Sequence, residues 1–188
     1  MIKIGVLIEE KELSEKEKTI IMTKACLGVD DPKILYTGGG MPHSCIGNDN
    51  KRLRMDASFS SNSAAVVITD EYFECAVDIQ SGARVGLGRL FELFGSHSVA
   101  DDENSESEIK SDIGLSLLIS SEDGIRVVSD KDFKLSYISP SLAARDSLLK
   151  WTVLESGIKC NGTKGIKTKT LLIKYKKNRY GVTITVSD

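Results

Sequence analysis

Three residues, one in the first half of the chain and two in the second, have the types and spacing that would suit binding of a divalent cation and a phosphate group. The segment 73–80 alternates apolar and polar residues and predicts a strand that places Asp78 on its less apolar face. Glu155 and Lys159 lie four residues apart, on one side of a predicted helix. Mg²⁺ prefers carboxylates, substrate phosphates and water as ligands, and a lysine ammonium attracts phosphate as a point charge. Asp78 and Glu155 could therefore hold Mg²⁺, with Lys159 facing a phosphate.

A plain structural explanation exists for each of these residues. Asp78 could be an acid at a strand end that is satisfied by backbone N–H groups or water. Trp151, Glu155 and Lys159 follow one another at intervals of four residues, which also suits a core tryptophan above an exposed Glu–Lys pair worth a few tenths of a kcal/mol. From the residues alone, both alternatives stay open.

The elements that would position these residues mix strands and helices without a regular alternation, which favours an α+β fold. A capping-box pattern, Ser14 with Glu17, predicts a helix over 15–27 that ends at Gly28. Residues 64–69 and 73–79 predict a β-hairpin, and 43–54 an irregular segment. Further strands are expected at 2–8, 33–37, 113–119, 125–128, 169–175 and 180–186, and further helices at 85–95 and from Pro140 to about Cys160.

Composition limits the classes of function. The chain has 188 residues with a formal net charge of −2, so it lacks the basic surplus of a nucleic-acid-binding protein. No apolar stretch is long enough for a membrane span, and the first ten residues predict a strand rather than a signal peptide, so we expect a cytoplasmic protein. The four cysteines fit no zinc spacing and are expected to be reduced, buried thiols. Residues 101–112 hold six acids and one lysine, which is typical of a solvated loop.

The order of several short motifs resembles the 4′-phosphopantetheinyl transferase superfamily, which includes holo-acyl-carrier-protein synthases. That family carries F-x-x-S-H-S, then a hydrophobic hairpin and (V/I)-D-(I/V)-E, and later W-x-x-K-E-x-x-x-K on a helix. In this chain Phe59 and 61–63 stand for the first motif, 77–80 for the second and 151–159 for the third. Residues 40–42, Gly-Met-Pro, are similar to an upstream G-K-P or G-R-P element. The resemblance covers roughly residues 38–80 and 140–186.

The resemblance implies a single domain over 1–188, built from two similar α+β halves related by a pseudo-twofold axis. The expected halves are 1–95 and 113–188, joined by an acidic loop at 96–112. Coenzyme A would lie between them. The implied reaction moves 4′-phosphopantetheine from coenzyme A to a serine of an apo acyl or peptidyl carrier protein, of the kind used in fatty acid, polyketide or nonribosomal peptide biosynthesis, and requires Mg²⁺.

The resemblance also implies a role for each matching residue. Asp78, Gln80 and Glu155 would bind the metal, Gln80 through its amide oxygen in place of the family's acid. Glu155, or a water on the metal, would deprotonate the carrier serine, and Lys159 would face the phosphates. The remaining expected roles are contacts to coenzyme A from Ser61 and Asn62, and anchoring of the helix against the core by Trp151.

Three departures from the family pattern replace cations with neutral side chains, namely Met41, Asn62 and Leu154. Weaker coenzyme A binding is the direct expectation. Cations at 51–54 could compensate, or could simply belong to a solvated basic loop. A second hypothesis is therefore a non-catalytic relative that binds a carrier protein or partner enzyme. A third is an unrelated α+β protein, in which Asp78 and Glu155 would lie far apart.

Overall fold

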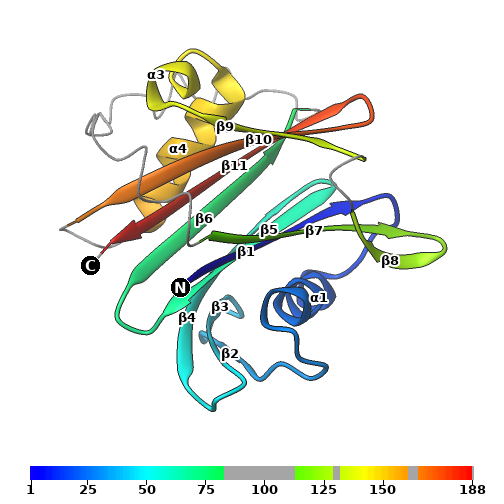
Figure 1. The fold of residues 1–188 in the computed structure, drawn as a ribbon, viewed down its shortest axis with the longest axis vertical. Helices are drawn as coiled ribbons and strands as arrows, with labels where there is room; N and C mark the ends of the chain where they lie inside the picture. Colours follow the sequence, from blue (N-terminus) through cyan, green and yellow to red (C-terminus); the bar gives the residue numbers. More distant parts are fainter. Residues whose placement is uncertain (83–112, 129–131, 161–164, 188) are drawn as a thin grey trace.

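The computed structural model describes residues 1–82, 113–128, 132–160 and 165–187, and contains two β-sheets and three helices in those ranges (Figure 1). Seven strands form one sheet, in the order β2-β3-β4-β5-β1-β7-β8, and four form the other, in the order β6-β11-β10-β9. The fold is thus mixed α+β and mostly sheet. Among the described residues, no helix is long and apolar enough to cross a membrane.

The seven-stranded sheet is antiparallel except where β1, the first strand in the chain, pairs with β7. Strand β1 pairs antiparallel with β5 and parallel with β7. The strands of this sheet are β1 (Ile2–Glu9), β2 (Ile34–Tyr36), β3 (Pro42–Ile46), β4 (Arg52–Ser60), β5 (Ser63–Asp70), β7 (Ile113–Ser121) and β8 (Gly124–Val127).

The four-stranded sheet is antiparallel throughout, with β6 at one edge and β9 at the other. Its strands are β6 (Glu74–Ser81), β9 (Lys134–Ile138), β10 (Lys167–Tyr175) and β11 (Asn178–Ser187). The side chains of alternate residues leave a strand on opposite faces. Each sheet therefore presents one face to the other sheet and one face to a helix.

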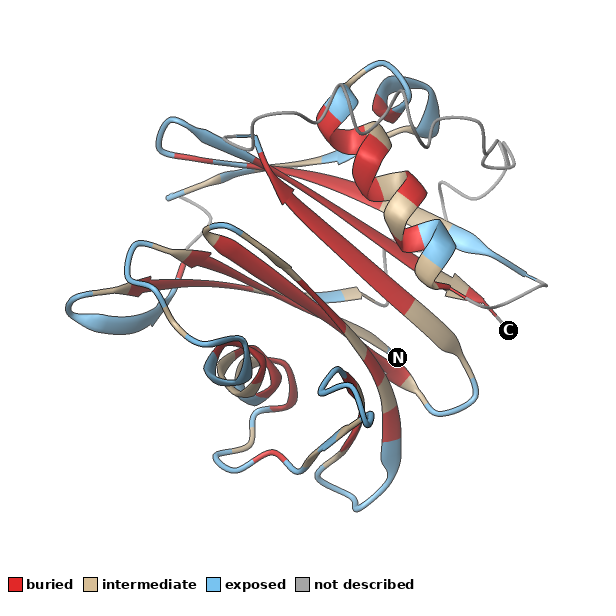
Figure 2. Ribbon diagram, turned by 180° about the vertical axis from the view of Figure 1, so that it is seen from behind, coloured by how far each residue is buried: buried red, intermediate tan, exposed pale blue. Residues whose placement is uncertain are grey.

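The main core lies between the two sheets, and each outer face carries a helix (Figure 2). The inter-sheet core takes apolar residues from both sheets, among them Ile4, Val77 and Ile173. Helix α1 (Glu15–Leu27) packs on β1, β5 and β7 over a second cluster that includes Met22. Helix α4 (Ser147–Lys159) packs on β6, β10 and β11. The outer face of β6 is therefore the face that α4 covers.

Both sheets contain a strand, a helix and a hairpin in the same relation, with other elements inserted between them. In the first, β1 and α1 are followed, after β2 and β3, by the β4–β5 hairpin, and β1 pairs antiparallel with β5. In the second, β6 is followed, after β7, β8, β9 and α3, by α4 and the β10–β11 hairpin, and β6 pairs antiparallel with β11. The two sheets therefore share a strand–helix–hairpin arrangement.

The boundary between the sheets does not follow the expected halves 1–95 and 113–188. Strand β6 lies before the acidic segment but joins the second sheet, whereas β7 and β8 lie after it and join the first. The prediction of a hairpin over 64–79 is also wrong, because its two strands belong to different sheets. Its two strands exist as β5 and β6, but β5 pairs with β1 and β4, and β6 pairs with β11. Local alternation predicts a strand and not its partner.

Several boundaries also differ from the sequence-based expectations. The segment 43–54 is not irregular, since it holds β3 and the start of β4, and β9 was not expected. The helix expected from Pro140 is two helices, α3 (Pro140–Ala143) and α4, because Asp146 caps a new helix by accepting from the N–H groups of Leu148 and Leu149. The capping box of Ser14 and Glu17 on α1 is confirmed. The expected helix at 85–95 and loop at 101–112 lie outside the described residues.

Candidate functional site

The alternation of β6 divides its side chains between the two faces as the sequence predicts. Val77 and Ile79 enter the inter-sheet core. Asp78 and Gln80 have the opposite orientation, toward α4, and are 0% and 2% exposed. A carboxylate that is fully buried in this way is unfavourable unless donors or a cation compensate it.

Buried hydroxyl groups fix the register of α4 against the sheet. Thr152 Oγ1 lies 2.7 Å from Thr183 Oγ1, and Ser156 Oγ lies 3.0 Å from Thr185 Oγ1. Thr183 is also the β11 residue paired with Asp78. Helix α4 therefore lies beside β6, and the turn of the helix that carries Glu155 and Lys159 is level with the buried carboxylate of Asp78.

The four site residues meet around the amide of Gln80. Its Nε2 donates to Asp78 Oδ2 and to Glu155 Oε2, each over 3.3 Å. Lys159 Nζ donates to Asp78 Oδ1 over 3.4 Å and to the carbonyl oxygen of Val77 over 3.1 Å. Asp78 and Glu155 therefore share one amide group, and the separation expected for an unrelated protein is not observed.

Burial sets the electrostatics of the site. It raises the pKa of Asp78 to about 6, an effect that the nearby Glu155 carboxylate reinforces and that Lys159, Ser58 and Gln80 oppose. The chain thus holds a carboxylate whose ionised form is poorly solvated, beside a second carboxylate. Such a pair favours a cation.

A row of side chains from β4 joins the first sheet to the edge of β6. Asp56 Oδ2 accepts the N–H of Val77 over 2.9 Å, and burial raises the pKa of Asp56. The next two positions of the row, Ser58 and Ser60, accept the N–H groups of Ile79 and Ser81 over 3.4 and 3.3 Å. Ser58 also donates to Asp78 Oδ1 over 2.8 Å. Sequence reasoning missed this row, although its polar residues at every second position of 56–60 were a readable signal.

The indole of Trp151 is buried, but not in the main core. It packs with Leu148 and Leu154 in a small cluster along α4. Leu154 is 6% exposed, so the position where the family has a lysine is an apolar contact here.

Ser61 and Asn62 form the turn between β4 and β5. Asn62 Nδ2 donates to the hydroxyl of Tyr180 over 3.3 Å, and its buried Oδ1 accepts no hydrogen bond in the described part of the chain. The structure gives neither residue a hydrogen bond to the site around Gln80 within the ranges that it describes. Their expected role at coenzyme A stays a prediction.

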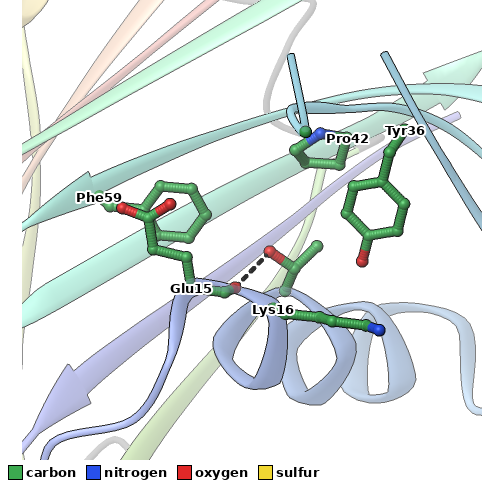
Figure 3. Close-up of a pocket in the computed structure, with 7 residues that line it drawn as sticks. Glu15, Lys16, Tyr36, Pro42 and Phe59 are labelled. Atoms are coloured by element: carbon green, nitrogen blue, oxygen red, sulfur yellow. Dashed lines mark hydrogen bonds between the residues drawn. The ribbon is translucent and has the colours of Figure 1, made fainter. Parts of the chain in front are cut away.

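A pocket of about 420 Å³ lies between α1 and strands β2 to β4 (Figure 3). The rings of Tyr36, Pro42 and Phe59 form its walls, and Gly40, Glu15, Lys16 and Thr19 complete the lining. The buried Tyr36 hydroxyl has no hydrogen-bond partner among the described residues. The pocket therefore joins two of the motif segments, Gly40–Pro42 and Phe59, but shares no residue with the site around Gln80.

The cations at 51–54 already have partners. Arg54 forms an ion pair with Glu74 over 2.7 Å, and Lys51 with Asp49 over 3.2 Å. Arg52 donates to the hydroxyl of Ser44 over 3.3 Å. Two of these three residues lie in β4 rather than in a loop.

The two carboxylates beside Gln80 could hold a divalent cation only together with ligands from a substrate and water. The described residues contain no group of three or more His, Cys, Asp or Glu side chains placed to bind a metal ion. A Mg²⁺ ion here would instead use the two carboxylates, substrate phosphates and water. The amide of Gln80 presents its donor Nε2 to both carboxylates, so its oxygen would bind the ion only after the amide is reversed. The four cysteines are free thiols, three of them buried, and are not among these ligands.

Comparison with known proteins gives the chain no relative. It matches no family model, no curated protein and no solved structure.

Proposed function

We propose that this protein is a Mg²⁺-dependent 4′-phosphopantetheinyl transferase that acts on a serine of an apo acyl or peptidyl carrier protein. The observation that carries the proposal is the meeting of Asp78 and Glu155 at the amide of Gln80, which lies 75 residues before Glu155 in the chain. The strand–helix–hairpin arrangement that the two sheets share also supports it, since the resemblance implies two similar halves. Asp78 on β6 and Glu155 on α4 would bind the same cation.

In this proposal the serine oxygen of the carrier attacks the pyrophosphate phosphorus nearest the pantetheine. The new P–O bond forms as the bond to the adenosine 3′,5′-bisphosphate leaving group breaks, and Glu155 accepts the serine proton. Lys159, whose side chain is 30% exposed and already near Asp78, places its charge beside the phosphates. A Mg²⁺ ion held by Asp78 and Glu155, and by the Gln80 oxygen once the amide is reversed, would supply stabilisation of the negative charge that develops on the pyrophosphate oxygens.

Ser61 and Asn62, in the turn after β4, are proposed to contact the nucleotide end of coenzyme A. The pocket beside α1 is not assigned to coenzyme A, because it lies on the outer face of the first sheet, whereas the residues around Gln80 lie on the outer face of the second.

The alternative is a non-catalytic relative that binds a carrier protein or partner enzyme. The neutral residues Met41, Asn62 and Leu154 favour it, because each stands where the family has a cation. Under this alternative the protein would bind a partner but would not bind coenzyme A in a Mg²⁺-dependent way.

Titration calorimetry of coenzyme A, with Mg²⁺ and with EDTA, distinguishes the transferase from the non-catalytic relative. The transferase proposal predicts binding that requires Mg²⁺ and that is lost in Asp78→Ala and Glu155→Ala. The matched control is Glu71→Ala, which removes an exposed acid in the turn before β6. Absence of Mg²⁺-dependent binding by the folded wild-type protein would favour the non-catalytic relative.

A further inference from the structure

Ser58 differs from its neighbours in the row that joins β4 to β6. Its hydroxyl takes part in two hydrogen bonds with β6, accepting the N–H of Ile79 over 3.4 Å and donating to Asp78 Oδ1 over 2.8 Å. Ser60 makes the first kind of bond, to Ser81, but the structure gives it no bond to a carboxylate in the described ranges. Ser58 is 5% exposed, so water does not readily replace it.

We propose that Ser58 is a positioning residue that orients the carboxylate of Asp78. This inference rests on the proposed function for its consequence, because an oriented Asp78 matters most as a metal ligand. Ser58 and Lys159 both donate to Oδ1. The other oxygen, Oδ2, is thereby turned toward Gln80, whose Nε2 reaches it over 3.3 Å. One oxygen of the carboxylate therefore accepts from Ser58 and Lys159, and the other faces Gln80.

A serine suits this task because one hydroxyl can donate and accept at the same time. Its acceptor bond to the Ile79 N–H fixes the oxygen, so that the hydroxyl hydrogen is free to point at Asp78. Hydrogen bonds of this kind orient metal ligands, and their loss commonly weakens metal binding 10- to 100-fold. Lys159 cannot replace Ser58, because its ammonium is on a long side chain that also donates to the Val77 carbonyl.

The position of Ser58 also couples the site to the contact between the sheets. Ser58 belongs to the seven-stranded sheet and Asp78 to the four-stranded sheet. The orientation of the carboxylate thus depends on how β4 lies against the edge of β6.

The test uses Mn²⁺ as a spectroscopic probe in place of Mg²⁺, with the full chain. Binding of Mn²⁺ is measured by electron paramagnetic resonance for the wild type and for Ser58→Ala, Ser58→Thr and Ser60→Ala. We expect the dissociation constant to rise about 10-fold or more in Ser58→Ala and to stay within about twofold in Ser58→Thr, which keeps the hydroxyl. Ser60→Ala is the matched control, since it removes a bond between β4 and β6 without touching Asp78.

Crystal structures of Ser58→Ala and Ser60→Ala give a second readout that needs no metal. We expect the Asp78 carboxylate to turn away from Gln80 in Ser58→Ala and to keep its orientation in Ser60→Ala. An unchanged orientation in Ser58→Ala overturns the inference, as does an equal loss of Mn²⁺ affinity in the two alanine variants. If the wild type binds no Mn²⁺, the metal-dependent function fails, and the orientation of Asp78 alone decides the role of Ser58.

Discussion

Gln80 Nε2 lies 3.3 Å from Glu155 Oε2, which ties the edge strand of the second sheet to the helix that covers it. The same nitrogen lies 3.3 Å from Asp78 Oδ2. The amide therefore stands between two carboxylates and donates to both. A cation with the same partners would interact with both charges, which is why this contact carries the proposed function.

Replacing Asp78 with asparagine should stabilise the protein at neutral pH. Burial raises the pKa of Asp78 to about 6 in the folded protein, against an ordinary value of 3.8. The native state therefore binds more protons than the unfolded state between these values, and stability falls as the pH rises through that window. We expect Asp78→Asn to gain up to about 3 kcal/mol above pH 6 and almost nothing near pH 3.5.

Denaturant unfolding of both proteins in metal-free buffer from pH 3.5 to pH 8 measures this difference. Glu71→Gln, in an exposed turn, should follow the wild type throughout. A gain that is the same at every pH would contradict the assignment of a raised pKa to Asp78.

The close approach of α4 to β11 predicts opposite effects for two glycine substitutions. A Cβ at Gly181 would lie 2.9 Å from Leu149 Cδ2 on the helix, so Gly181→Ala should destabilise the protein by about 1–3 kcal/mol. Gly157, within α4, has open space around its Cβ position. Gly157→Ala should add about 0.5–1 kcal/mol by restricting the unfolded chain. Thermal unfolding checks both, and stabilisation by Gly181→Ala would show that α4 is not tightly packed there.

A buried ion pair between β1 and α1 predicts a strongly non-additive pair of substitutions. Glu9 Oε1 lies 2.7 Å from Lys18 Nζ, and the two side chains are 4% and 8% exposed. Lys18→Met leaves the Glu9 charge buried without its counter-ion and should cost about 3–5 kcal/mol. Glu9→Gln together with Lys18→Met removes both charges and should lie much closer to the wild type. A double-mutant cycle by urea unfolding measures this, and simple additivity would contradict a direct pair.

The capping box of α1 predicts a smaller local effect. Ser14 Oγ accepts the Glu17 N–H over 3.3 Å, and Glu17 Oε2 accepts the Ser14 N–H over 2.9 Å. Ser14→Ala should cost about 1 kcal/mol of unfolding free energy. Ser14→Asp, which keeps a capping oxygen, is the control that should retain most of the stability. Equal losses in the two variants would argue against capping as the cause.

Local patterns predicted individual elements well, because each depends on residues close in sequence. The capping box located α1, and the alternation over 73–80 placed Asp78 and Gln80 on one face of β6. The spacing of Glu155 and Lys159 predicted that they share one side of a helix, and in the structure Glu155 contacts Gln80 and Lys159 contacts Asp78. Strand partners were not predictable in this way. The adjacent strands β5 and β6 read as a hairpin, but they joined different sheets.

The missed features depended on tertiary context or on a pattern left unread. Alternation over 52–60 was present in the sequence, with Leu53, Met55, Ala57 and Phe59 on the α1 face. The alternation was not recognised as a strand because the segment begins with the charged residues Arg52 and Arg54. The break before α4 required Asp146 to act as an N-cap, and Arg179 stabilises that aspartate from β11. Only the fold showed that Ser58, from the other sheet, contacts Asp78.

Transfer itself is the central claim, and intact-mass spectrometry tests it most directly. Purified protein, coenzyme A and Mg²⁺ are incubated with a panel of apo acyl and peptidyl carrier proteins. The account predicts a gain of one phosphopantetheine mass on at least one carrier, absent with EDTA, lost in Asp78→Ala and Glu155→Ala, and kept in Glu71→Ala. No gain on any carrier with the folded wild-type protein, or an undiminished gain with Asp78→Ala, would contradict it.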